Sequence, residues 1–170
     1  METFLVNTLA FIPARSGSKG VIDKNIRNLN GIPLLAYSVH IAQLCLKQGI
    51  FSDVLVSTDS MQYLQKIKKT GYTKEYIRPK ELAQDESPTI DAIIHAINDY
   101  AKKNIFFDNV MILQPTSPFR SIQDIKKSIQ ILQSNPLTSC VASVFKLGDH
   151  HPRRIKLINK DGFLDDFCDE

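Results

Sequence analysis

The residues best suited to chemistry lie in one short stretch, residues 11–25, which reads FIPARSGSKGVIDKN. An apolar run leads into a loop with two glycines and the cationic side chains Arg15, Lys19 and Lys24. Glycines let backbone N–H groups approach a ligand closely, and the cations neutralise negative charge. This combination indicates a site for a polyanion such as a triphosphate. A Gly/Ser surface turn with solvated Lys and Arg side chains is the alternative.

The stretch differs from the two most familiar phosphate-binding motifs. A Walker loop ends in Gly-Lys-Ser/Thr, whereas here Lys19 precedes Gly20. The dinucleotide fingerprint is Gly-x-Gly-x-x-Gly, and only the spacing of its last pair is present, between Gly17 and Gly20. The loop is therefore neither a standard P-loop nor a Rossmann NAD site.

The composition is that of an ordinary globular chain with a mild charge. The chain has 170 residues, 43% of them hydrophobic, which predicts a single domain over residues 1–170 with a buried core. Its 21 basic and 18 acidic residues leave a formal charge of +3, too small to indicate a nucleic acid or an acidic membrane as a partner. No apolar run reaches the length that spans a bilayer, and no signal peptide is indicated.

The three cysteines, Cys45, Cys140 and Cys168, are far apart and form no C-x-x-C pair. This spacing indicates neither a zinc site nor a disulfide framework. Cys45 and Cys140 lie among apolar residues and are predicted to be core thiols. Because reduced thiols are typical of the cytoplasm, a cytoplasmic location is expected.

Apolar and amphipathic segments alternate along the chain. Short apolar runs predict strands at residues 8–12, 53–57, 76–77, 109–113 and 139–145, with an edge strand near 154–158. Helical spacing predicts helices at residues 34–47, 61–69, about 88–103 and 122–133. This alternation favours a three-layer, Rossmann-like α/β fold with a mostly parallel sheet and helices on both faces.

The spacing also predicts which helix faces are buried and which residues cap the helices. The expected buried residues are Leu34, Leu35, Val39, Ala42 and Leu46 in the first helix, Ile90, Ile93, Ile94 and Ile97 in the third, and Ile122, Ile125, Ile129 and Leu132 in the fourth. The expected N-terminal caps are Ser60 or Asp59, Ser87 with Pro88 as first helical residue, and Ser121.

Polar side chains follow three of the predicted strands, at the ends where parallel sheets bind ligands. They are Arg15, Ser18 and Lys19 after the first strand, Ser57, Thr58 and Asp59 after the second, and Gln114, Thr116 and Ser117 after the third. We expect these groups to converge on one crevice. The helix that begins near Pro88 could aim its N-terminal N–H groups at the same place.

These motifs resemble those of the acylneuraminate (CMP-sialic acid) cytidylyltransferases and of relatives that activate other eight- or nine-carbon keto-sugar acids. The shared strings, in the family's order from about residue 9 to 152, are IPARSGSKG followed by KN, VSTD, RPKELAQD, SPTIDAIIHAI, LQPTSPFR and HHP. The resemblance implies a fold of the nucleotide-diphospho-sugar transferase type. It also implies an enzyme that joins CTP to a keto-sugar acid and releases pyrophosphate, with the sugar's anomeric hydroxyl attacking the α-phosphate in line.

The resemblance implies roles for individual residues. Those expected to bind the nucleotide are Arg15, Ser18, Lys19, Lys24, Asn25, Arg78, Ser87 and Thr89. Those expected to contact the sugar acid are Gln114, Thr116, Ser117 and Arg154. Of these residues, Arg15, Lys19 and Gln114 are the candidates for the catalytic step.

Simpler structural roles stay open for several of these residues. Lys24 could be solvated at a helix entry, and Arg78 could form a surface ion pair. Gln114 could satisfy loop backbone groups, and Thr116 and Ser117 could only form a turn.

Structural roles are also considered for five further polar residues. Asp59 and Asp85 could be metal ligands, or they could serve as a cap and a turn residue. His150 and His151 are adjacent, so their side chains would point apart on an extended segment, and a loop role is favoured over a metal pair. His95 is expected to be a partly buried structural histidine.

The resemblance covers only the front of the family's usual length. The family's later Arg-Pro-Asn-Gly segment and its Asp-Ile-Asp-type metal motif do not occur, and the sequence stops at Asp166-Phe-Cys-Asp-Glu170. We therefore expect a fold truncated at its C-terminus. Mg²⁺ is the implied cofactor, with its carboxylate ligands expected outside this sequence and no metal ligand assigned within it.

Three functional hypotheses follow. The first is a cytidylyltransferase with CTP and a keto-sugar acid as partners, typically a homodimer. The second is a truncated, non-catalytic module that binds the nucleotide without turnover. The third is a different nucleotidyltransferase on a similar fold, such as a CMP-KDO or molybdopterin-type enzyme.

Overall fold

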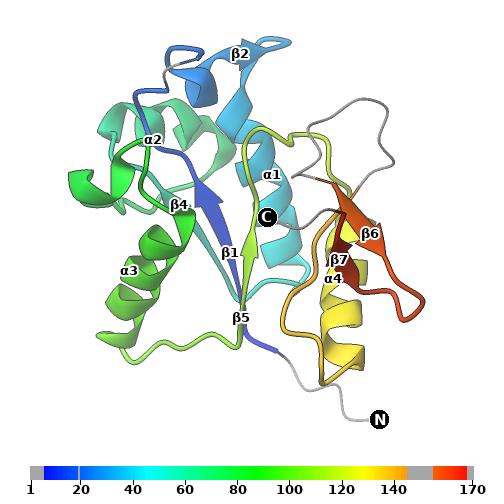
Figure 1. The fold of residues 1–170 in the computed structure, drawn as a ribbon. Helices are drawn as coiled ribbons and strands as arrows, with labels where there is room; N and C mark the ends of the chain where they lie inside the picture. The colour runs from blue at the N-terminus through cyan, green and yellow to red at the C-terminus, as the bar shows by residue number, and fades with distance from the viewer. Residues whose placement is uncertain (1–5, 19, 145–154, 168–170) are drawn as a thin grey trace. The chain divides into compact units, whose positions relative to one another are not determined.

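The computed structural model describes residues 6–18, 20–144 and 155–167, and Figure 1 shows how their elements are arranged. By its internal contacts the chain divides into two compact units, residues 1–127 and 128–170. The first unit contains the sheet and the helices that position the candidate site. The prediction of one domain over residues 1–170 stays a prediction.

A parallel sheet of three strands forms the centre of the first unit. Its strands are β1 (Thr8–Pro13), β4 (Asp53–Ser57) and β5 (Asn109–Ile112), in the order β4-β1-β5. The central strand β1 is apolar and almost wholly buried, as expected for a strand that is covered on both faces. In register, Leu9 pairs with Asp53 and Val110, so all three strands end at the same edge of the sheet.

The helices follow the predicted positions closely. They are α1 (Leu34–Lys47), α2 (Met61–Ile67), α3 (Thr89–Ala101) and α4 (Ile122–Ser134), with 3₁₀ turns at Lys24–Ile26, Lys68–Thr70 and Lys80–Ala83. The predicted second helix ran to residue 69, but its last turn tightens into the 3₁₀ turn that ends at Gly71. Gly71 has φ +85°, a conformation that favours glycine. The predicted Rossmann-like α/β fold is confirmed.

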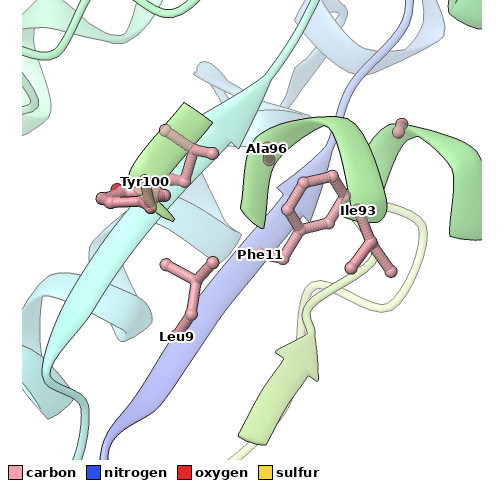
Figure 2. Close-up of a cluster of buried hydrophobic side chains, with 7 residues drawn as sticks. Leu9, Phe11, Ile93, Ala96 and Tyr100 are labelled. Atoms are coloured by element: carbon pink, nitrogen blue, oxygen red, sulfur yellow. The ribbon is translucent and has the colours of Figure 1, made fainter. Parts of the chain in front are cut away.

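Helix α3 packs on one face of the sheet and forms the main core cluster with β1 (Figure 2). Ile93, Ala96 and Tyr100 face Leu9 and Phe11 of the central strand. Strand side chains alternate between faces, so the neighbouring residues of β1 point to the opposite face, where α1 makes its contacts with the sheet. Figure 1 shows α1 and α3 on the two sides of β1.

The predicted buried face of α3 is partly wrong. Ile93 is only 5% exposed, but Ile90 and Ile94 are 56% and 50% exposed. The residues that accompany Ile93 in the core are Ala92 and Ala96, which are fully buried. Small side chains at the contact let the helix approach the sheet closely, and the larger isoleucines on the adjacent face then project away from it.

Helix α1 is rotated in a similar way relative to the prediction. Val39, Ala42 and Cys45 are fully buried, whereas Leu46, which was expected inside, is exposed. Cys45 has no exposed surface, so the predicted core thiol is confirmed there, and its burial raises the pKa of the thiol. The same prediction is wrong for Cys140, which is exposed.

The predicted caps have mixed outcomes. Ser121 caps α4: its Oγ accepts from the Asp124 N–H (3.1 Å) and donates to the Asp124 carboxylate (2.6 Å). Ser60 precedes α2 without a side-chain capping bond among the described residues, and Pro88 takes the cap position that was expected for Ser87. Ser87 instead donates from Oγ to the Glu81 carbonyl (2.8 Å).

A small hairpin before α1 was not predicted. Strand β2 (Asn28–Leu29) pairs antiparallel with β3 (Ile32–Pro33). The two residues between them, Asn30 and Gly31, have φ values of +49° and +80°. An Asn-Gly pair with both φ values positive is a common two-residue hairpin turn, so the sequence did carry this signal.

The second unit departs most from expectation. The described residues 139–144 form no strand, so that prediction is wrong for them, and Phe145 lies outside the described residues. Strand β6 (Lys156–Ile158) falls within the edge strand expected near 154–158, but it pairs antiparallel with β7 (Leu164–Asp166) in a sheet of its own. A run with strand propensity forms a strand only when a partner strand pairs with it.

The short strand expected at residues 76–77 is reduced to one parallel bridge between Ile77 and Thr58. Among the helices of the described residues, none combines the length and the apolar character that crossing a membrane would require.

The rotation of α3 can be tested with two adjacent substitutions. Ile93→Ala should lower the free energy of unfolding by about 2–5 kcal/mol, because it leaves a cavity between α3 and β1. Ile94→Ala removes the same atoms from an exposed position and should cost less than about 1 kcal/mol. Urea denaturation followed by circular dichroism measures both. Similar losses for the two variants would contradict the observed helix face.

Candidate functional site

The loop after β1 begins at the carboxyl edge of the sheet. The Ala14 N–H donates to the Ser57 carbonyl (2.9 Å), which extends the contact between β1 and β4 by one residue. Gly17 then takes φ +67°, a conformation that L-residues with a side chain rarely adopt. The chain therefore turns sharply at Gly17, and the residues that precede it, Arg15 and Ser16, stay at the end of β1.

Asp59, just beyond β4, holds this loop in place. The Ser16 N–H donates to Asp59 Oδ1 (2.7 Å), and the Ser16 hydroxyl donates to Asp59 Oδ2 (2.5 Å). Burial alone would raise the pKa of Asp59, but the bonds from Ser16 and the nearby charge of Arg78 lower that pKa below the ordinary value. Asp59 therefore acts as a charged clamp between two strand ends and does not cap α2.

Arg78 connects the same strand end to the segment that follows it. Its guanidinium donates from Nη2 to the Ser57 carbonyl (2.6 Å) and from Nη1 to the Leu82 carbonyl (3.2 Å). The residue is only 4% exposed, and burial lowers its pKa. The surface ion pair considered for Arg78 is therefore wrong. Its Nε is buried without a hydrogen-bond partner among the described residues.

These contacts shape a mostly polar cavity of about 270 Å³. Its lining is Arg15, Ser16, Gly17 and Asp59 from the two strand ends, and Lys80, Ala83, Gln84 and Asp85 from the segment after Arg78. Within it, Arg15 Nη2 lies 2.5 Å from Asp85 Oδ1. The cavity therefore holds two cations and two carboxylates, with a glycine loop along one side.

The remaining residues of the loop motif lie next to Arg15. Asn25 is buried, and its Nδ2 donates to the Arg15 carbonyl (3.0 Å). Lys24 is half-buried in the 3₁₀ turn that starts there, and Ser18 is half-buried in the loop. Lys19 lies outside the described residues. The structure thus brings Asn25 to the backbone of Arg15, while neither Lys24 nor Ser18 lines the cavity.

The residues after β5 form a separate part of the same sheet edge. Gln114, Thr116 and Ser117 are exposed and are not among the residues that line the cavity. The Ser117 N–H donates to the Gln114 carbonyl (3.1 Å), which closes a turn. Convergence of these residues with Arg15 on a single cavity is therefore not observed, and Arg154 lies outside the described residues.

Arg120 holds this turn in place, a role that was not predicted from the sequence. Its guanidinium donates to the Gln114 carbonyl (2.8 Å) and to the hydroxyl of Ser38 on α1 (2.9 Å). Burial lowers the pKa of Arg120. The string LQPTSPFR thus ends in an arginine that ties its own turn to a helix.

The start of α3 is close in sequence to the cavity wall. Thr89 is the first residue of the helix and is exposed, while Ser87 bonds back to the preceding turn. Neither lines the cavity. His95 is half-buried as predicted and shares a hydrogen bond between its Nδ1 and the Tyr76 hydroxyl (2.6 Å). His150 and His151 lie outside the described residues.

A larger cavity of about 420 Å³ lies at the amino end of β4 and is a weaker candidate. Within it, Lys74 pairs with Asp53, and the Tyr100 hydroxyl donates to Asp53 (2.8 Å). Its lining is mainly apolar. Ligands of parallel α/β sheets bind at the carboxyl ends of the strands, which favours the smaller cavity.

The described residues do not form a metal centre. No group of three or more His, Cys, Asp or Glu side chains is placed among them to hold an ion. Both oxygens of Asp59 accept from Ser16, and Asp85 faces Arg15. The interpretation of Asp59 as a metal ligand therefore has no support from its contacts.

Lys80 and Gln84 line the cavity, although neither was predicted from the sequence to be a site residue. Both belong to the string RPKELAQD, two and six residues after Arg78. Their place in the wall depends on the short 3₁₀ turn, in which the Gln84 side chain donates to the Lys80 carbonyl (2.8 Å). A single 3₁₀ turn has no apolar periodicity, so the sequence pattern did not predict it.

Comparison with known proteins finds a family model and relatives that agree with one another. A family model described as cytidylyltransferase matches residues 9–154. The chain is 38% identical over 123 residues to the CMP-N,N'-diacetyllegionaminic acid synthase of Legionella pneumophila, covering 72% of this chain and 52% of that protein. It is 39% identical over 136 residues to the N-acylneuraminate cytidylyltransferase of Escherichia coli, covering 80% of this chain and 30% of that protein.

Two further comparisons extend this picture. The pseudaminic acid cytidylyltransferase of Campylobacter jejuni is 32% identical over 125 residues, covering 74% of this chain and 53% of that protein. A solved structure of CMP:2-keto-3-deoxy-manno-octonic acid synthetase, complexed with CTP, is similar to this chain with a TM-score of 0.60 and 21% sequence identity. The match covers 77% of this chain and 49% of the synthetase chain. That likeness shows the fold. The chain spans about half or less of the length of these relatives.

The clamp formed by Asp59 should make the stability of the chain depend on pH. The folded-state pKa of Asp59 is depressed, so its contribution is present above the unfolded pKa of about 3.9 and is lost as pH falls through the folded value. At pH 7, Asp59→Asn should lower the free energy of unfolding by on the order of 1 kcal/mol. Urea denaturation at pH 7 and pH 3 should show the difference from wild type shrinking at the lower pH. Asp161→Asn, an exposed carboxylate in a turn, is the control. A difference that does not change with pH would argue against a charged clamp.

Proposed function

Because this chain belongs to the cytidylyltransferase family, we propose that it is the nucleotide-binding part of an enzyme that transfers CMP from CTP to a keto-sugar acid. The anomeric hydroxyl oxygen of the acid would form a bond to the α-phosphorus, and the bond from that phosphorus to the β-phosphate would break, which releases pyrophosphate. Such a transfer depends chiefly on positioning and on neutralising phosphate charge.

One observation supports the nucleotide assignment more than any other. Arg15 lies on a glycine-containing loop at the carboxyl end of the central strand and lines a polar cavity together with Lys80. Polyanions bind where cations and accessible backbone N–H groups are gathered, and parallel α/β sheets place their ligands at this edge. In the proposed complex the triphosphate lies against Arg15, with Lys19 and Lys24 from the same motif as further phosphate ligands.

The other motif residues are proposed to act around this centre. Asn25 orients Arg15 through its bond to the Arg15 carbonyl. Ser18, Ser87 and Thr89 are proposed nucleotide contacts, and Gln114, Thr116, Ser117 and Arg154 are proposed contacts of the sugar acid. Arg78 is tied to two carbonyls, so we assign it a positioning role for the nucleotide site.

The class of acceptor is proposed from the relatives. Their names refer to diacetyllegionaminic, N-acylneuraminic and pseudaminic acids, which supports a sialic acid or a related sugar acid as the substrate. The solved CMP:2-keto-3-deoxy-manno-octonic acid synthetase shares the fold at low identity and does not favour that acid over the others. A homodimer and a cytoplasmic location stay predictions.

Magnesium is proposed to accompany the triphosphate. The described residues do not fit a metal site built by the protein, because the two carboxylates of the cavity are engaged with Ser16 and Arg15. We therefore propose that Mg²⁺ is held mainly by phosphate oxygens, as is usual for this ion, with any carboxylate ligands outside the described residues.

The proposed reaction is tested by mixing the protein with CTP, Mg²⁺ and a panel of keto-sugar acids. Release of pyrophosphate with CTP and one of the acids is the expected result. CTP binding by calorimetry without any release would identify a non-catalytic nucleotide-binding module. Equal release with ATP, GTP or UTP in place of CTP would contradict the cytidylyltransferase assignment and favour another nucleotidyltransferase.

The phosphate role of the loop predicts a difference between two ligands. Arg15→Ala and Lys19→Ala should each weaken CTP binding by about tenfold, since each removes a charge-assisted contact to phosphate, and should leave cytidine binding unchanged. Isothermal titration calorimetry measures both ligands. Lys47→Ala, at the exposed end of α1, is the control for loss of one positive charge. Equal weakening of CTP and cytidine would show that the loop does not bind phosphate.

A further inference from the structure

Two carboxylates face the cavity in which an anionic ligand is proposed to bind. Asp59 is committed to the loop, because both of its oxygens accept hydrogen bonds from Ser16. Asp85 has a different position: it lies directly against Arg15, with the guanidinium and the carboxylate 2.5 Å apart. The cation best placed to bind a phosphate is thus already paired with an anion of the protein itself.

From this geometry we propose that Asp85 sets the affinity of the site, as an internal anion that a ligand's phosphates must displace from Arg15. The proposal rests on the proposed function, because it assumes that phosphate binds at Arg15. Displacing Asp85 costs every ligand the same free energy. A ligand with little negative charge gains too little from Arg15 to displace Asp85, whereas a triphosphate gains enough.

The ion pair is suited to such an exchange. The side chains of Arg15 and Asp85 are 32% and 29% exposed, so water and salt screen their attraction. A partly exposed pair contributes modestly to stability, which means that a strongly charged ligand can replace one partner at low cost. A fully buried pair would resist replacement, because one charge would be left uncompensated.

The segment that carries Asp85 is anchored through residues that precede Asp85 in the sequence. Arg78 holds the Leu82 carbonyl, and the Gln84 side chain holds the Lys80 carbonyl. The 3₁₀ turn ends at Ala83, and Asp85 follows it in an exposed stretch of chain. In the proposed exchange, Asp85 turns away from Arg15 while the turn that carries Lys80 keeps its place in the cavity wall.

The charge of the cavity changes when Asp85 leaves. With Asp85 in place, the cations Arg15 and Lys80 are balanced by Asp59 and Asp85. No ion pair joins Lys80 to a carboxylate within the described ranges, so Lys80 is available to the incoming phosphate as well. Displacement of Asp85 leaves two cations facing the ligand and one carboxylate that is held by Ser16. The ligand thus meets a more positive site than the one the unliganded chain presents.

The test measures binding of inorganic tripolyphosphate and of inorganic phosphate by calorimetry, without metal, so that neither base nor sugar contributes. Asp85→Asn removes the competing charge and should tighten tripolyphosphate binding about fivefold, the value expected for a partly exposed pair. Asp85→Ser, which also shortens the side chain, should produce a similar gain. Inorganic phosphate should gain by the same factor as tripolyphosphate relative to wild type, because the fraction of molecules in which Arg15 is free of Asp85 does not depend on the ligand.

Two controls separate local exchange from a general charge effect. Glu86→Gln makes the same change of charge at the next, exposed position, which does not line the cavity, and should leave binding unchanged. In an Arg15→Ala background, Asp85→Asn should lose most of its effect, since the cation over which the two anions compete is gone.

The outcomes are distinct for the two proposals. Suppose that wild type binds tripolyphosphate but Asp85→Asn and Asp85→Ser bind it no more tightly, or that Glu86→Gln gives the same gain. Either result would show that Asp85 does not compete with phosphate for Arg15, while the phosphate site itself would still stand. An undiminished effect of Asp85→Asn without Arg15 would also overturn the exchange. Tripolyphosphate binding to none of these folded proteins, as judged by circular dichroism, would overturn the phosphate site together with the role of Asp85.

Discussion

The candidate site depends on one buried charge, the guanidinium of Arg78. Placing an arginine at 4% exposure is costly unless its N–H groups find acceptors, and here the carbonyls of Ser57 and Leu82 accept from Nη2 and Nη1. Those carbonyls belong to two segments that the sheet alone would not connect: the end of β4 and the turn that carries Lys80. The requirement to satisfy Arg78 therefore fixes one wall of the cavity relative to the strand ends.

The other wall is fixed by the same end of β4. Asp59 follows Ser57 by two residues and binds the backbone and hydroxyl of Ser16, so the loop after β1 is held by a charge that lies close to Arg78. Each wall of the cavity is thus positioned by a charged side chain, Arg78 for one and Asp59 for the other, whose hydrogen bonds the apolar core could not provide. A site that works by positioning needs such support, because the ligand-binding side chains are otherwise free to rotate.

Much of this arrangement follows from the sequence, for identifiable reasons. Apolar patterns predicted the helices and the strands of the parallel sheet, and glycine with cations predicted the loop after β1, because those signals are local. The buried face of α3 was not predicted, since Ala92 and Ala96 contact the sheet through their small size, a feature that hydrophobicity ignores. The pairing of Arg15 with Asp85 joins residues 70 positions apart, and no local pattern encodes it.

Arg15, Arg78 and Arg120 show why a motif gives positions more readily than roles. All three are arginines beside strand ends in strings that were singled out together, yet they act differently. Arg15 faces a cavity and a carboxylate, Arg78 is enclosed by carbonyls, and Arg120 ties the Gln114 turn to Ser38. The guanidinium has five donors in a fixed plane, so it can bind a phosphate or brace a backbone equally well. Burial decides between these uses: Arg78 is enclosed and bonded to two carbonyls, whereas the partly exposed Arg15 can exchange its partner.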